Sequence, residues 1–242
     1  PLSELLLMKD QTPSAAFSKD CYTEVRVLCA KALSNLKDHS SVHVFLYCLN
    51  DKNENYKIRL TCADALGKLG DKYAVNSLMD VVSDESEKSV YIRESAAVAL
   101  GLIGDMRAVD SLVKVLESQN GIMDKFTYLK EKAIEALCRL SPNNDRTFKA
   151  LKRSINDENP QVRINTIEAL MDYDNEEAKD LIKQMLSDED EDVQKNAVTA
   201  LYNIDGEEVL KEILNNPSYS EACKNEAREI LEDESENDDE ET

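Results

Sequence analysis

Apolar and polar residues follow each other along this chain in a pattern that returns about every 33 residues. The clearest copy is IRESAAVALGLIG, residues 92–104, where apolar side chains recur at the three- and four-residue spacing of one helix face. The copies align when Arg93 is placed over Arg26, Arg59, Lys130, Arg163 and Gln194. We call these six residues the anchors, and in chain order, with Arg93 included, they are separated by 33, 34, 37, 33 and 31 positions. This periodicity predicts a stack of similar helical units.

Two positions are the same in all six copies. The sixth residue after the anchor is always alanine and the seventh is always leucine: Ala32, Ala65, Ala99, Ala136, Ala169 and Ala200, then Leu33, Leu66, Leu100, Leu137, Leu170 and Leu201. The segment that contains these residues is the first helix of each unit, which we call helix A. Small residues beside leucine on its inner face allow close helix packing. We expect Gly67, Gly70, Gly101 and Gly104 to end helix A in left-handed backbone.

The pattern predicts an all-α fold, a single solenoid over residues 1–231. Each hairpin pairs helix A with a second helix, helix B, such as VHVFLYCL at 42–49. The units are a partial N-terminal one at 1–18, hairpins at about 19–50, 51–83, 84–118, 119–156, 157–187 and 188–216, and a capping helix at 218–231. The acidic residues 232–242 are too polar to pack, which predicts a disordered tail.

The fourth hairpin has a longer entry than the others. Its segment 118–128, SQNGIMDKFTY, carries several apolar residues. It either extends the first helix of that hairpin against the third one or offers an exposed apolar contact to a partner. We favour the extended helix.

The segments IRESAAVALGLIGDMRAVDSL (92–112) and IRLTCADALGKLGDKYAVNSL (58–78) resemble the HEAT-repeat class, in particular the short repeats named after phycobilisome lyases. The resemblance covers roughly residues 20–214. It implies about six helical hairpins stacked in a right-handed α-α superhelix, with B helices lining a concave face that binds another protein. Members of the class include scaffolds, adaptors, bilin lyases and an iron-dependent hydroxylase. The hydroxylase holds its iron through paired His-Glu dipeptides, which this chain lacks.

The 242 residues carry a net charge of -20, and eight of the acidic residues lie in the last eleven. Such a charge repels nucleic-acid phosphates unless a local basic stripe overcomes it. No apolar run approaches the roughly 18 residues that a membrane-spanning helix needs. The six cysteines are scattered, which predicts free thiols in a reducing compartment. We therefore expect a soluble, cytoplasmic protein.

Few residues of this chain suggest chemistry. His39 and His43 are the only histidines, and their four-residue spacing lacks a third metal ligand nearby. No base stands near a serine or cysteine nucleophile, and no glycine-rich phosphate loop is present. We expect no metal, no cofactor and no catalysis, although the resemblance leaves lyase activity open.

The anchor arginines precede acidic turn residues by a constant twelve positions in the first three hairpins. This spacing predicts a structural ladder of charged hydrogen bonds between repeats, and the alternative is a row of arginines that binds a ligand. The ladder residues are Arg26, Arg59, Arg93, Arg163, Asp38, Asp71 and Asp105.

The outward positions of the B helices form a second row, one helical turn apart within each helix. The candidate partner-binding residues are His43, Tyr47, Asn76, Asp80, Asp110, Lys114, Lys149, Lys152, Arg153, Asp180 and Gln184. The middle of this row is basic on an otherwise acidic protein, so it suits an acidic peptide or helix. The equally weighted alternative is an ordinary solvated mixture of charges.

These features predict a non-catalytic protein-interaction scaffold or adaptor that binds a partner along the concave B-helix face. One alternative is a bilin lyase or its chaperone-like subunit, which would bind a tetrapyrrole. Another is a HEAT-like nucleic-acid-binding protein, which the net charge of -20 disfavours.

Overall fold

The computed structural model describes residues 1–9, 19–118, 127–141, 144–173 and 175–240. Helices are the regular elements throughout these ranges, and no strand occurs in them, so the predicted all-α class is confirmed. The chain divides into two compact units, residues 1–141 and 142–242. Each unit is a stack of helices, and the continuity of one solenoid through both stays a prediction.

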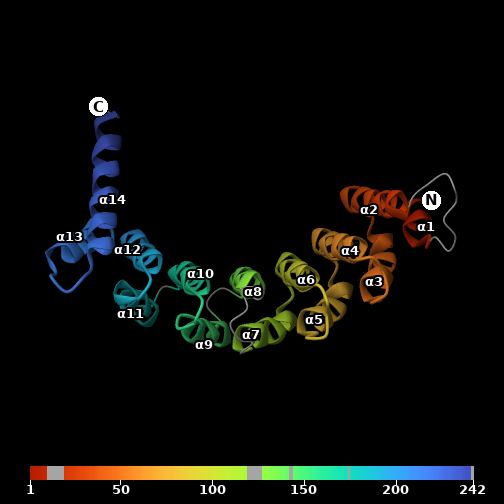
Figure 1. The fold of residues 1–242 in the computed structure, drawn as a ribbon, viewed down its shortest axis with the longest axis horizontal. Coiled ribbons are helices and arrows are strands. Elements are labelled where there is room, and N and C mark those ends of the chain that lie inside the picture. Colours follow the sequence, from red (N-terminus) through yellow and green to blue (C-terminus); the bar gives the residue numbers. More distant parts are fainter. Residues whose placement is uncertain (10–18, 119–126, 142–143, 174, 241–242) are drawn as a thin grey trace. The chain divides into compact units, whose positions relative to one another are not determined.

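Unit 1 contains two layers of helices (Figure 1). The A layer consists of α2 (Lys19–Asn35), α4 (Tyr56–Leu69), α6 (Val90–Ile103) and α8 (Thr127–Leu140). The B layer consists of α1 (Leu2–Leu7), α3 (Val42–Asn50), α5 (Val75–Ser83) and α7 (Val109–Glu117). The predicted apolar entry of the fourth hairpin lies largely outside the described residues, which resume at Thr127.

In unit 2, A and B helices again follow each other along the chain. Its helices are α9 (Asp145–Ser154), α10 (Pro160–Met171), α11 (Glu176–Gln184), α12 (Glu191–Asp205), α13 (Glu207–Asn215) and α14 (Glu221–Glu240), with a 3-10 turn at Met185–Ser187. Asn159 caps α10 by accepting a hydrogen bond from the Gln161 N–H, and Pro160 occupies the first turn.

The backbone of α14 runs to Glu240, whereas the sequence predicts disorder from residue 232. Extending an existing helix needs no new nucleus, and the glutamates of this segment are good helix formers.

Each turn from helix A to helix B in unit 1 is a short 3-10 helix, at His39–Ser41, Lys72–Ala74 and Met106–Ala108. An aspartate stands before each, and its carboxylate accepts a hydrogen bond from the backbone N–H two residues later. The aspartates Asp38, Asp71 and Asp105 are therefore caps that fix the turn.

The repeated leucines form the centre of the core, and all six are buried. Two of the four glycines end helices as predicted, because Gly70 and Gly104 have φ of 69° and 73°. The prediction is wrong for the other two, which lie inside helices. A Cβ on Gly67 would stand 2.7 Å from the Ala99 Cα, and one on Gly101 would stand 2.9 Å from the Ala136 Cα. These glycines are required for close packing of neighbouring A helices.

This close packing decides which way unit 1 curves. Successive A helices contact one another extensively, while successive B helices are splayed apart. In Figure 1 the row α2, α4, α6, α8 accordingly lies on the inner side of the curve of this unit. The expectation that B helices line a concave face is therefore corrected for unit 1, where the B layer is the outer one.

Candidate functional site

The anchor arginines are buried between repeats. Arg59 donates from Nε to the Leu49 carbonyl at 2.8 Å, and one of its terminal nitrogens lies 2.7 Å from Glu87 Oε2. Arg26 repeats the arrangement with the Leu6 carbonyl at 2.7 Å and Glu54 at 2.6 Å. Each arginine thus joins the end of the preceding B helix to the loop that leads into the next A helix.

Three further anchors make similar contacts. Arg93 donates to the Val82 carbonyl at 2.9 Å, and Arg163 contacts Asp188 at 2.6 Å. In the sixth repeat Gln194 replaces arginine and donates from Nε2 to the Asp188 carbonyl at 2.6 Å. Arg26, Arg59 and Arg163 each contact a carboxylate of the following repeat.

The acidic side of the ladder was predicted wrongly. The arginines bond to Glu54, Glu87 and Asp188, not to the turn aspartates, because each guanidinium reaches the loop between hairpins rather than the turn within one. The turn aspartates instead cap their own turns, and Asp71 also lies near the preceding turn, where His39 Nδ1 is 3.9 Å from Asp71 Oδ2.

Acid should weaken this ladder at Glu87. Burial by itself raises the pKa of the Glu87 carboxyl, but hydrogen bonds from Arg59 and the Ser89 N–H hold that pKa below its ordinary 4.5. A lowered folded-state pKa adds stability above the unfolded pKa and loses it as pH falls through the folded one. We expect the free energy of unfolding to fall below about pH 4.5 and to fall less steeply in Glu87→Gln. Urea titrations at several pH values measure both slopes, and equal slopes would contradict the assignment.

The B-layer residues predicted to bind a partner are exposed in both units. In unit 1 they are His43 and Tyr47 on α3, Asn76 and Asp80 on α5, and Asp110 and Lys114 on α7. In unit 2 they are Lys149, Lys152 and Arg153 on α9, and Asp180 and Gln184 on α11. The Lys152 ammonium pairs with Glu177 of α11, so part of the basic charge in unit 2 is already neutralised.

Two of the predicted residues meet at a hollow in the B layer of unit 1. The hollow has a volume of about 440 Å³ and lies between α3 and α5, reaching the turn before α7. Its lining residues are His43, Leu46, Asn50, Lys72, Tyr73, Asn76, Ser77 and Arg107. They include two permanent cations and no carboxylate. The splay of the B helices makes room for this hollow.

Several polar contacts organise the hollow. The rings of His43 and Tyr73 meet edge to face with centroids 5.0 Å apart. Asn50 Nδ2 lies 3.3 Å from Ser77 Oγ. Arg107 spans three groups, because it contacts Asp105, the Lys72 carbonyl at 3.2 Å and Asn76 Oδ1 at 3.4 Å. These contacts fix side chains of neighbouring repeats relative to each other.

Sequence reasoning missed Lys72, Tyr73 and Arg107 as members of this surface. They lie in the 3-10 turns rather than in the B helices, so a row counted along helical positions passes over them. The signal that was available is a cationic or aromatic residue at one of the two positions after each turn aspartate.

The two histidines lie in neighbouring elements of the first hairpin. His39 is in a 3-10 turn and His43 is in α3, and each faces a neighbour in the next repeat. In the part of the chain that the structure describes, no three His, Cys, Asp or Glu side chains are placed to hold a metal ion. Among the described helices, none is both long and apolar enough to cross a bilayer.

The family model described as HEAT repeats matches residues 13–91, 52–123, 120–186 and 148–232. The complex of CpcE and CpcF of phycocyanin lyase from Nostoc sp. PCC7120 aligns at a TM-score of 0.54 and 21% identity, over 87% of this chain and 86% of that chain. The Escherichia coli protein YibA aligns at 0.57 and 19%, over 91% and 78%. No curated protein sequence matches. At such identities the structural likeness shows the fold alone.

Proposed function

Because the chain belongs to the HEAT-repeat family, we propose that it is a non-catalytic protein-interaction scaffold. The observation that carries the proposal is the hollow between α3 and α5, whose exposed side chains are not part of the buried core of the stack. His43, Tyr73 and Asn76 are exposed there, while the core of the unit is closed by buried leucines. Side chains that are ordered by mutual contacts but left open to solvent are suited to recognition.

The chemistry of the hollow favours a polypeptide with acidic side chains. Asn50, Asn76 and Ser77 supply donors and acceptors that match backbone amides. Tyr73, 65% exposed, supplies a rigid aromatic surface of the kind enriched at interface hot spots. Lys72 attracts carboxylates, while the guanidinium of Arg107 is paired with Asp105 at 2.8 Å and positions the side chains around it.

Removing two side chains of the hollow should release the partner. We expect Tyr73→Ala/Asn76→Ala to lower the recovery of a co-purifying protein from source-organism lysate by about tenfold or more, because loss of an interface aromatic alone costs about 2 kcal/mol. The thermal unfolding midpoint should not change, since both side chains are exposed. Quantitative affinity capture measures the recovery.

A matched control removes the same residue types elsewhere. Tyr91 lies on α6 in the other layer and Asn53 lies in a loop, and both are exposed. Tyr91→Ala/Asn53→Ala should retain the partner. Equal recovery with both double variants would exclude the hollow as the binding surface.

The exposed candidate residues on α9 and α11 of unit 2 are a second proposed contact region for the same class of partner. Charge reversal in Lys149→Glu/Arg153→Glu tests it separately from the hollow. An unchanged recovery would restrict the interface to unit 1.

The lyase alternative has only the fold likeness to the phycocyanin lyase complex in its favour. A bilin lyase would change the visible absorption of an added open-chain tetrapyrrole, and a scaffold would not. Nucleic-acid binding would show affinity that falls steeply with salt, and the net charge of -20 opposes it.

A further inference from the structure

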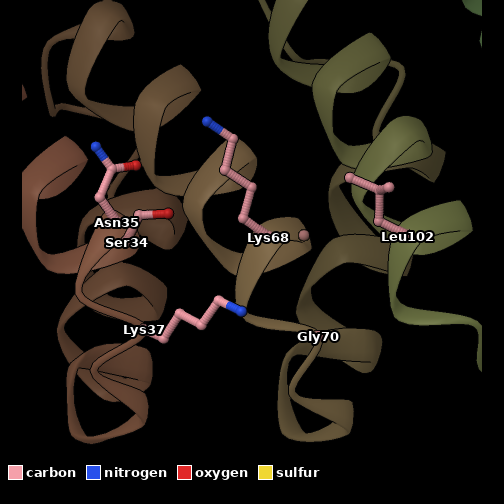
Figure 2. A pocket seen from close by; sticks show the side chains of 7 residues that line it. Ser34, Asn35, Lys37, Lys68, Gly70 and Leu102 are labelled. Carbon is pink, nitrogen blue, oxygen red and sulfur yellow. The ribbon is translucent and has the colours of Figure 1, made fainter.

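A second hollow, of about 580 Å³, lies in the A layer of unit 1 (Figure 2). Its lining residues come from three successive A helices and the turns after two of them: Ser34, Asn35, Lys37, Gly67, Lys68, Gly70 and Leu102. Two of these are lysines and none is acidic. This composition is unusual for a chain with a net charge of -20.

Ser34 departs from the repeat pattern at this hollow. It stands eight residues after its anchor, where the next two repeats have Gly67 and Gly101. The residue is only 6% exposed, and its hydroxyl has no hydrogen-bond partner among the residues that the structure describes. A buried hydroxyl without a partner lowers stability, so its presence calls for an explanation. Figure 2 shows the hydroxyl on the side of α2 that faces α4.

Lys37 departs from the same pattern. It stands eleven residues after its anchor, where the next two repeats have the left-handed Gly70 and Gly104. Its own φ is 53°, and no other non-glycine residue in the described part of the chain has a positive φ. A side chain in this conformation strains the backbone, whereas glycine does not.

Both departures occur in one repeat, and each places a hydrogen-bond donor at the same hollow at a cost in stability. Local violations of a fold's own rules are expected at functional sites. Lys68 adds a second ammonium group, and neither lysine forms an ion pair with a described residue.

We propose that this hollow binds an oxyanion, either a carboxylate or a phosphate group. The Lys37 and Lys68 ammonium groups and the Ser34 hydroxyl are its donors, because charge-assisted hydrogen bonds are the strong ones for such groups. Asn35 also lines the hollow, and Leu102, 47% exposed, offers an apolar surface to the rest of the ligand. The site is in the A layer and is independent of the partner surface in the B layer.

The test removes the three proposed donors one at a time. Inorganic phosphate and sodium acetate are titrated separately into the full chain at constant ionic strength, and backbone amide shifts near Ser34, Lys37 and Gly70 are followed by NMR. We expect saturable shifts with at least one of the two probes. Ser34→Ala, Lys37→Gly and Lys68→Gln should each weaken binding by about 2- to 10-fold, the range for one lost hydrogen bond.

The unfolding temperature of the variants distinguishes a binding role of Ser34 and Lys37 from a structural role. Ser34→Ala and Lys37→Gly should unfold at the same temperature as the parent or higher, because they remove an unsatisfied hydroxyl and a strained backbone. Lys57→Gln, at an exposed position in the first turn of α4, removes one charge away from the hollow and should leave the affinity unchanged.

Saturation with phosphate alone assigns a phosphate ligand, and saturation with acetate alone assigns a carboxylate. Shifts that match those produced by sodium chloride would overturn the proposal. The proposal would also be overturned if the three variants bound the probe with the same affinity as Lys57→Gln.

Discussion

Arg59→Ala is expected to lower the free energy of unfolding by about 3 to 5 kcal/mol, the range for breaking a buried ion pair from one side. The substitution leaves the Glu87 carboxylate, whose side chain is 4% exposed, without its cation. It also leaves the carbonyl of Leu49, at the end of α3, without the Nε donor. Urea denaturation followed by circular dichroism measures the change.

An exposed ion pair in the same loops provides the control. Lys52 lies 2.6 Å from Asp84, and the lysine side chain is 61% exposed. Lys52→Ala should change the free energy of unfolding by about 1 kcal/mol or less, because solvent screens such pairs. If Arg59→Ala were as mild as Lys52→Ala, the arginine ladder would not hold the repeats together. Loss of partner binding without loss of stability in Arg59→Ala would instead favour the ligand-binding row.

Leu100→Ala is expected to cost about 2 to 5 kcal/mol through the cavity that it leaves. Leu100 is fully buried and is the repeated leucine of α6, where it packs in the middle of unit 1. Because each repeat of a solenoid contacts only its neighbours, a defect in a central repeat weakens two interfaces. Chemical denaturation gives the loss as a lower midpoint.

The control for this substitution lies two residues along the same helix. Leu102 is 47% exposed, so Leu102→Ala removes the same atoms with little loss of packing, and the expected change is within about 0.5 kcal/mol. A neutral Leu100→Ala would mean that the repeat register is wrong.

The candidate surface was predictable in part. The outward B-helix positions His43 and Asn76 follow from helical periodicity alone, and the structure places both at the hollow. Lys72, Tyr73 and Arg107 do not follow from it, because they belong to 3-10 turns whose side-chain directions depend on the aspartate caps. The contact between Arg107 and the Lys72 carbonyl joins residues 35 positions apart, which no local pattern encodes.

The sequence by itself determined the all-α class, the repeat register, the buried leucines and the left-handed Gly70 and Gly104. These features are local, since each depends on residues within one or two turns of helix and recurs in phase. Only the tertiary structure decided which carboxylates the anchor arginines bind, since Arg26 and Glu54 are separated by a whole hairpin. It also decided that the A helices form the inner layer of unit 1, because that depends on how closely Gly67 approaches Ala99 in the next repeat. Both results depend on packing between repeats, which cannot be read from the sequence of one repeat alone.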